Sequence, residues 1–232
     1  MVRGLPGQCE VCRSACQGSL CSDCIQRFAA PVFRCARCAL RLGLPAPTCI
    51  ACTRSPPPFV RTVCVADYAF PWDRLITAFK FEDQAQLAGT LAHLLAQRVD
   101  AAAVADAAGP AAQMVLPVPL SPQRLAERGY NQAWELACRV AKRCGLLARA
   151  DLLQRPADTA HQADLSRAER QANLRRAFMV EPRHRSALAG RHLALVDDVM
   201  TTGATVREAA AVLLRAGAAS VQVWVLARTP DD

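Results

Sequence analysis

The sequence predicts an α/β fold, in which a parallel sheet carries helices on both faces and follows a small cysteine-rich module. Two observations predict it. Beyond residue 58, strand-like apolar runs alternate with helical patterns, which is typical of a parallel sheet. Before residue 55, the chain carries four CxxC pairs. We therefore expect a module over 1–54 and an α/β domain over 59–232.

The cysteine-rich module predicts two metal sites. Without an apolar leader, CxxC pairs are more typical of metal knuckles than of disulfides. An all-cysteine zinc site needs four thiolates and leaves no open position, so we expect two structural zincs. The spacing leaves open whether the sites are built from sequential or interleaved pairs. The expected ligands are Cys9, Cys12, Cys21, Cys24, Cys35, Cys38, Cys49 and Cys52.

A proline run follows this module. Ser55-Pro56-Pro57-Pro58 favours a stiff, extended segment, which indicates a domain edge. We therefore expect the module and the sheet to have separate cores, so that a chelator loosens the first and leaves the second folded.

The α/β domain is predicted element by element from its periodicity. Residues 150–191 are polar, basic and poorly periodic, which predicts a long excursion that a compact domain keeps either for function or as a disordered segment. The other patterns, in chain order, are a strand over 59–70, helices over 71–80 and 82–108, a strand over 113–120, a helical pattern over 122–145 interrupted at Gly129, a strand over 192–196, a helix over 204–216 and a strand over 220–228.

The run "LALVDDVMTTGATV" (193–206) concentrates carboxylates and hydroxyls after a buried strand. In a parallel sheet the ligand crevice lies beyond the carboxyl ends of the strands. Backbone N–H groups of the turn and of the next helix can donate hydrogen bonds to a phosphate. The two carboxylates can accept hydrogen bonds from the hydroxyls of a ribose. The run therefore predicts a ribose 5-phosphate site formed by Asp197, Asp198, Val199, Met200, Thr201, Thr202, Gly203, Ala204 and Thr205.

These motifs carry a family resemblance. The run 193–206 is similar to the ribose-phosphate signature of type I phosphoribosyltransferases. "VLPVPLSPQRLAERGYNQAWELA" (115–137) resembles a stretch of the ComF family of competence-associated proteins, and the CxxC pairs resemble its double zinc ribbon. A further run, from Arg155 to Phe178, follows the family pattern with Ala157 in place of an arginine.

The resemblance covers nearly the whole chain and implies a type I phosphoribosyltransferase-like fold that binds 5-phosphoribosyl-1-pyrophosphate with Mg²⁺. Loss of pyrophosphate from C1 builds positive charge on the sugar, so Mg²⁺ and basic donors on the leaving group lower the barrier. Arginine binds phosphate in a bidentate manner. The pyrophosphate-binding candidates are Lys80, Arg124, Arg128 and Arg155.

Two functions from different classes remain open. The first is a role in DNA uptake and natural competence, in which the pocket and the basic stretch 121–191 bind a nucleotide or single-stranded DNA and the chain contacts competence-machinery proteins. The second is an active phosphoribosyltransferase that transfers to a nitrogen acceptor. Residues 121–191 carry 14 Lys/Arg against 7 Asp/Glu, and this local net charge of +7 favours the first function. Only 5% of the residues are aromatic, which provides few stacking platforms for DNA bases.

The sequence also bears on location. Residues 1–10 lack the apolar core of a signal peptide, and no apolar run is long enough to span a bilayer. We therefore expect a cytoplasmic protein without membrane insertion.

Overall fold

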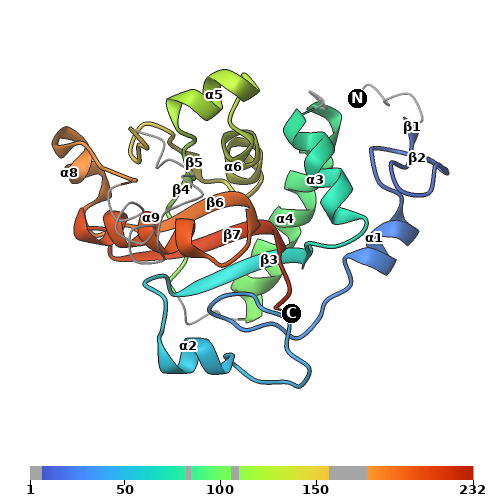
Figure 1. Cartoon of the computed structure of the whole chain (residues 1–232), viewed down its shortest axis with the longest axis horizontal. Coiled ribbons are helices and arrows are strands. Elements are labelled where there is room, and N and C mark those ends of the chain that lie inside the picture. The colour runs from blue at the N-terminus through green and yellow to red at the C-terminus, as the bar shows by residue number, and fades with distance from the viewer. Residues whose placement is uncertain (1–6, 82–84, 106–109, 157–176, 232) are drawn as a thin grey trace, which may run out of the picture.

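The computed structural model describes residues 7–81, 85–105, 110–156 and 177–231. A five-stranded parallel sheet lies at its centre, in the order β3-β7-β6-β4-β5 (Figure 1). The strands are β3 (Arg61–Asp67), β4 (Met114–Pro117), β5 (Leu147–Ala148), β6 (His192–Met200) and β7 (Ser220–Arg228). The predicted α/β parallel sheet is confirmed.

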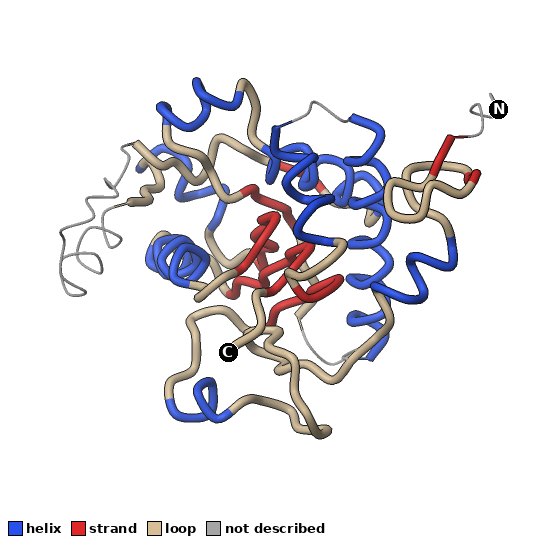
Figure 2. The backbone as a smooth tube through the Cα atoms, turned by 45° about the vertical axis from the view of Figure 1, so that its right-hand side comes forward, coloured by secondary structure: helices blue, strands red, loops and turns tan. Residues whose placement is uncertain are grey.

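Helices cover both faces of the sheet, as Figure 2 shows. Because side chains alternate along a strand, neighbouring residues of β6 enter different apolar clusters: Val196 packs with helices α3, α4 and α6, and Leu195 packs with α9. The helices of the domain are α3 (Trp72–Phe81), α4 (Ala85–Ala105), α5 (Pro122–Arg128), α6 (Gln132–Arg143), α8 (Arg185–Leu188) and α9 (Ala204–Arg215), with a 3₁₀ turn, η1 (Pro182–His184).

The helical pattern 122–145 is divided where the sequence predicts. Ser121 caps α5 by accepting from Arg124 N at 3.3 Å, and Gly129 ends that helix in the left-handed region at φ +75°. Asn131 then caps α6, since its side chain accepts from Ala133 N at 2.9 Å. Two separate helix starts therefore face the same end of the sheet.

The strand predicted over 192–196 is longer in the structure. β6 continues to Met200 because the whole segment pairs in register with β7, from His192 opposite Ser220 to Met200 opposite Arg228. Asp197 and Asp198 thus lie in the strand itself and not in the turn after it.

The cysteine-rich segment folds into short elements, β1 (Gly7–Gln8), β2 (Ala15–Cys16), α1 (Ser22–Phe28) and α2 (Ile50–Arg54). Its cores are not separate from the sheet. Cys9 and Leu20 pack in the cluster that contains Leu91 of α4, whereas Cys35 packs in the cluster of the α9 face. The proline run therefore joins the two parts without isolating them.

No helix within the described ranges is long and apolar enough to cross a membrane.

Candidate functional site

A cavity of about 140 Å³ lies beyond the carboxyl ends of β4 and β6. It occupies the point where the connections diverge, since the chain leaves β4 toward β5 and leaves β6 toward β7. The residues that line it come from the ends of α3 and β6, the loop after β4, both ends of α5, the starts of α6 and α9, and the loop after β5. They are Lys80, Val118, Pro119, Leu120, Arg124, Arg128, Asn131, Gln132, Ala133, Arg155, Asp197, Asp198 and Thr205.

Two adjacent carboxylates form the acidic side of this cavity. Asp198 is buried, and its Oδ1 lies 3.3 Å from Lys80 Nζ. Asp197 Oδ1 accepts from the backbone N–H of Asp198 at 2.9 Å. Burial, and then the charge of Asp198, raise the pKa of Asp197 to about 8, against smaller opposing effects of that hydrogen bond and of Lys80. The pair therefore holds a proton near neutral pH.

The lining of the cavity also includes basic side chains. All four predicted pyrophosphate-binding residues line it, although they come from three separate parts of the chain. Arg128 donates to Gln132 Oε1 at 3.1 Å, and Arg155 lies over the Phe178 ring at 5.6 Å from its centre. Two carboxylates and four cationic side chains thus line one small space, and Lys80 pairs directly with Asp198.

The surrounding backbone is held by polar side chains at the start of α6 and just before it. Asn131 Nδ2 donates to Val118 O at 3.1 Å, which fixes the loop after β4, and Gln132 Nε2 donates to Lys80 O at 3.2 Å. Tyr130 donates its hydroxyl to Phe79 O. These bonds tie the end of α3 to the start of α6 and place Lys80 next to Asp198.

The threonine loop, residues 201–205, contributes to the cavity only at its end. Thr205, in the first turn of α9, lines it, whereas Thr201 and Thr202 are exposed beside it. Gly203 adopts φ +78°, which a side chain would strain, and Met200 packs beneath it. The structure thus brings Asp197, Asp198 and Thr205 together and leaves Thr201 and Thr202 at the rim.

Part of the predicted site lies outside the described residues. This is the portion 157–176 of the run between Arg155 and Phe178.

The eight paired cysteines form two clusters with sequential pairing. In each cluster all four Sγ atoms lie within 4.8 Å of one another, and the clusters are Cys9, Cys12, Cys21, Cys24 and Cys35, Cys38, Cys49, Cys52. Cys12 and Cys21 Sγ are 3.6 Å apart, and Cys38 and Cys49 Sγ are 3.7 Å apart. Those separations are near the ~3.8 Å edge of a tetrahedral metal–thiolate site with bonds of ~2.3 Å, and far from a disulfide of ~2.0 Å.

The four thiolates of each cluster would saturate a metal ion, so the donor sets fit two structural metal sites. The interleaved arrangement is wrong, because each cluster takes two consecutive CxxC pairs.

The burial of two residues near the site was not predicted from the sequence. Ser121 is fully buried as the cap of α5, and its signal is the Ser-Pro start of that helix. Arg228 is buried at the end of β7, where an arginine after an apolar strand gives no sign of burial.

Comparison with known proteins identifies the class. A family model described as "Phosphoribosyl transferase domain" matches residues 158–232. A solved glutamine phosphoribosylpyrophosphate amidotransferase from Bacillus subtilis aligns over 63% of this chain and 30% of its own, with 19% identity and a TM-score of 0.41. The parallel sheet and the matching domain model define an α/β protein with a phosphoribosyltransferase domain.

Relatives identify the family. DNA utilization protein YhgH of Salmonella typhi is 38% identical over 97% of this chain and 98% of that protein. Competence protein F of Haemophilus influenzae is 33% identical over 95% of this chain and 96% of that protein. The chain belongs to the ComF family, to which the competence protein F and YhgH relatives correspond.

Proposed function

We propose that the cavity binds a ribose 5-phosphate ligand, 5-phosphoribosyl-1-pyrophosphate with Mg²⁺, and that the protein acts in the cytoplasm in DNA uptake or DNA use. One observation carries the proposal: two adjacent carboxylates and four cationic side chains line one cavity at the carboxyl edge of a parallel sheet. Competence protein F and DNA utilization protein YhgH, by their names, support the DNA role. In this role the basic stretch 121–191 would contact single-stranded DNA, and other competence proteins would be partners.

The residues have distinct roles in this proposal. Asp197 and Asp198 accept from the ribose hydroxyls, and Thr205 with the backbone N–H groups of the loop and the α9 start binds the 5-phosphate. Lys80, Arg124, Arg128 and Arg155, which line the same cavity, bind the pyrophosphate. Mg²⁺ would neutralise part of the pyrophosphate charge when bound.

A second candidate is an active transferase, in which phosphoribosyl passes to a nitrogen acceptor. The phosphoribosyltransferase domain match favours it. The cationic residues would then stabilise the departing pyrophosphate as positive charge develops at C1. The acceptor would approach from the side of the sugar opposite the leaving group.

The division of the chain into 1–54 and 59–232 is part of the same proposal, with zinc as the metal of both clusters. An all-cysteine donor set is typical of zinc, and two such sites would hold the short elements of the module in place.

A double substitution tests the ligand site. Asp197→Ala together with Asp198→Ala should abolish calorimetric binding of Mg²⁺–phosphoribosyl pyrophosphate while the far-UV circular dichroism stays that of the wild type. Asp100→Ala, which removes an exposed carboxylate of α4, is the control and should bind normally. Equal affinity of the double variant and the wild type would refute the assignment.

The raised pKa gives a second test. The Asp197 carboxyl has a pKa of about 8 in the folded chain and about 3.9 unfolded. The folded state therefore binds the proton more tightly, and the free energy of unfolding should fall as the pH rises between those values. Asp197→Asn should remove that part of the pH dependence. An Asn variant whose denaturation midpoints follow the wild-type pH profile would contradict a protonated Asp197.

Salt dependence separates the two candidate functions. Binding of single-stranded DNA should weaken with salt, with a log–log slope of about −0.7 per neutralised phosphate. A transferase should instead release pyrophosphate when nucleobases are supplied as acceptors. Pyrophosphate release without measurable DNA affinity at physiological salt would favour the transferase.

A further inference from the structure

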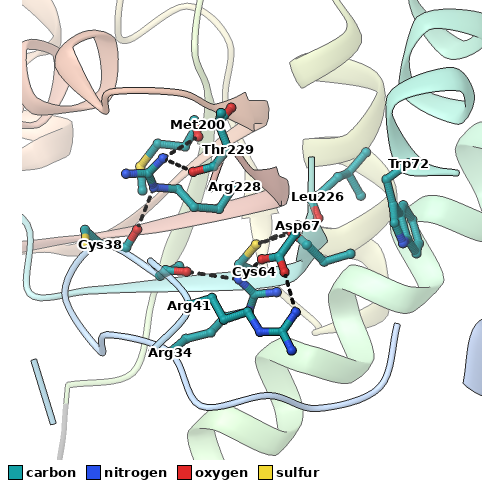
Figure 3. Close-up of polar contacts among 12 residues, drawn as sticks. Arg34, Cys38, Arg41, Cys64, Asp67, Trp72, Met200, Leu226, Arg228 and Thr229 are labelled. Atoms are coloured by element: carbon teal, nitrogen blue, oxygen red, sulfur yellow. Dashed lines mark hydrogen bonds and ion pairs between the residues drawn. The ribbon is translucent and has the colours of Figure 1, made fainter. Parts of the chain in front are cut away.

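Arg228 lies where the second cysteine cluster meets the end of the sheet (Figure 3). It is the last residue of β7, stands opposite Met200 in the register with β6, and is only 7% exposed. A buried guanidinium is costly unless its donors are paired, so its partners indicate what it holds together.

Its donors reach two distant segments of the chain. Nε donates to the carbonyl oxygen of Cys38 at 3.2 Å, and Nη1 donates to Met200 O at 3.4 Å and to Thr229 O. Nη2 lies 3.7 Å from Asp231, whose carboxylate is exposed. The guanidinium thus connects the module before the proline run to the last residue of β6.

The Cys38 carbonyl belongs to the second cysteine cluster. Cys38 Sγ is one of its four donors, and the knuckle is closed by Ala39 N donating to Cys35 O at 2.8 Å. Arg34 donates to Ala39 O at 3.1 Å and to Asp67 at 2.6 Å. A metal held by four thiolates fixes the Cys38 backbone, and with it the acceptor of Arg228.

The Met200 carbonyl precedes the threonine loop. It also accepts from Thr229 N at 3.0 Å, so two donors from the end of β7 fix it. The Met200 side chain packs beneath Gly203, with Sδ 3.5 Å from where a Cβ of that glycine would lie. The position of Met200 therefore sets where the loop begins and what supports it.

We propose that Arg228 is a positioning residue that couples metal binding at the second cysteine cluster to the conformation of the threonine loop. With the metal bound, the Cys38 carbonyl holds the guanidinium, which holds Met200 and so preorganises the loop for a phosphate. Loss of that metal frees the Cys38 backbone and loosens the loop. The proposal rests on the proposed function only for the identity of the ligand, because the coupling to the loop can be measured without one.

The first cysteine cluster is the internal control. It packs on the opposite face of the sheet, and within the described ranges no hydrogen bond connects it to residues 197–205. Its metal should leave the loop unchanged.

Amide hydrogen exchange of residues 199–205 tests the coupling. We expect Arg228→Met, which keeps most of the side-chain volume and removes every donor, to speed exchange there at least tenfold while both metals remain bound. Arg41→Met is the matched control, because Arg41 pairs with Asp67 in the same region and is exposed. It should leave the exchange of the loop unchanged.

A second pair of variants tests the same coupling without changing Arg228, so the test does not depend on the folding of Arg228→Met. Cys49→Ser breaks the second cluster and leaves Arg228 in place, whereas Cys21→Ser breaks the first. Only Cys49→Ser should speed exchange in 199–205. Equal exchange in the wild type and in folded, two-metal Arg228→Met, or equal effects of the two cysteine variants, would overturn the coupling.

Calorimetry with Mg²⁺–phosphoribosyl pyrophosphate separates this proposal from the proposed function. If the ligand binds, Arg228→Met should weaken it about tenfold, and unchanged affinity would overturn the preorganisation. A wild-type protein that binds none of it would refute the proposed function, and the exchange measurement would still decide the coupling.

Discussion

The two cysteine clusters have the same ligands and the same CxxC spacing, yet they occupy opposite faces of the sheet. The first packs with the helices of the α4 face, and the second packs with strand residues on the α9 face. In the first, Cys12 is exposed, whereas all four cysteines of the second are buried. Identical metal chemistry has thus been placed in two different environments.

Their attachments differ in the same way. The first segment is held to helices, since Trp72 donates its indole N–H to Phe28 O at 2.7 Å and Ser19 N donates to Thr90 Oγ1 at 3.4 Å. The second is held to strands, because Thr62 N of β3 donates to Ala36 O at 2.9 Å and Arg228 of β7 donates to Cys38 O. The neighbours of a metal knuckle, more than its ligands, decide what the metal stabilises.

The largest expected effect compares equivalent ligands of the two clusters. Cys49→Ser should lower the free energy of unfolding by more than about 3 kcal/mol, because it removes a metal from under the sheet and leaves buried thiols unpaired. Cys21→Ser should cost less, about 1–2 kcal/mol, with the loss of protection confined to residues 7–29. Denaturant unfolding and metal analysis check this, and each variant should keep one metal. Equal losses in the two variants would contradict the comparison.

The next largest effect is expected when the ion pair beside each cysteine cluster is broken and the losses of stability are compared. Arg34 and Asp67 are 2.6 Å apart and largely buried, and Arg34 also donates to Ala39 O. Arg34→Met should therefore cost about 2–3 kcal/mol, since it leaves a partly buried carboxylate with only the exposed Arg41. Arg13→Met, beside the first cluster, removes an exposed pair with Glu10 and should cost less than about 0.5 kcal/mol. Thermal unfolding of both variants measures the difference, and similar shifts would show that burial does not separate the clusters.

The order of strands and helices could be predicted from the sequence because it depends on local periodicity. The strand over 220–228 is confirmed residue for residue as β7, and the break at Gly129 is confirmed by its left-handed conformation. The end of β6 could not be predicted, because adjacent aspartates disfavour a strand locally and pairing with β7 overrides that preference.

The cavity was predictable in its residue types and less so in its geometry. The run 193–206 indicates ligand chemistry by itself, but Lys80 reaches Asp198 only through the packing of α3 against α6. The hydrogen bond between Arg228 and Cys38 joins residues far apart in the sequence, and no local pattern predicts such a contact. Contacts between the module and the sheet are therefore what the structure adds.

The smallest expected effect concerns the hydrogen bond by which Trp72 of α3 holds the segment of the first cysteine cluster. Trp72 is buried, and Trp72→Phe keeps an aromatic ring while removing the N–H that donates to Phe28 O. Losing this one hydrogen bond to the end of α1 costs about 1 kcal/mol. Exchange should therefore quicken in residues 20–29 and stay unchanged in 199–205. Trp134→Phe, on α6, is the matched control and should alter neither segment, whereas faster exchange of the threonine loop in Trp72→Phe would mean that the first cluster, too, is coupled to the site.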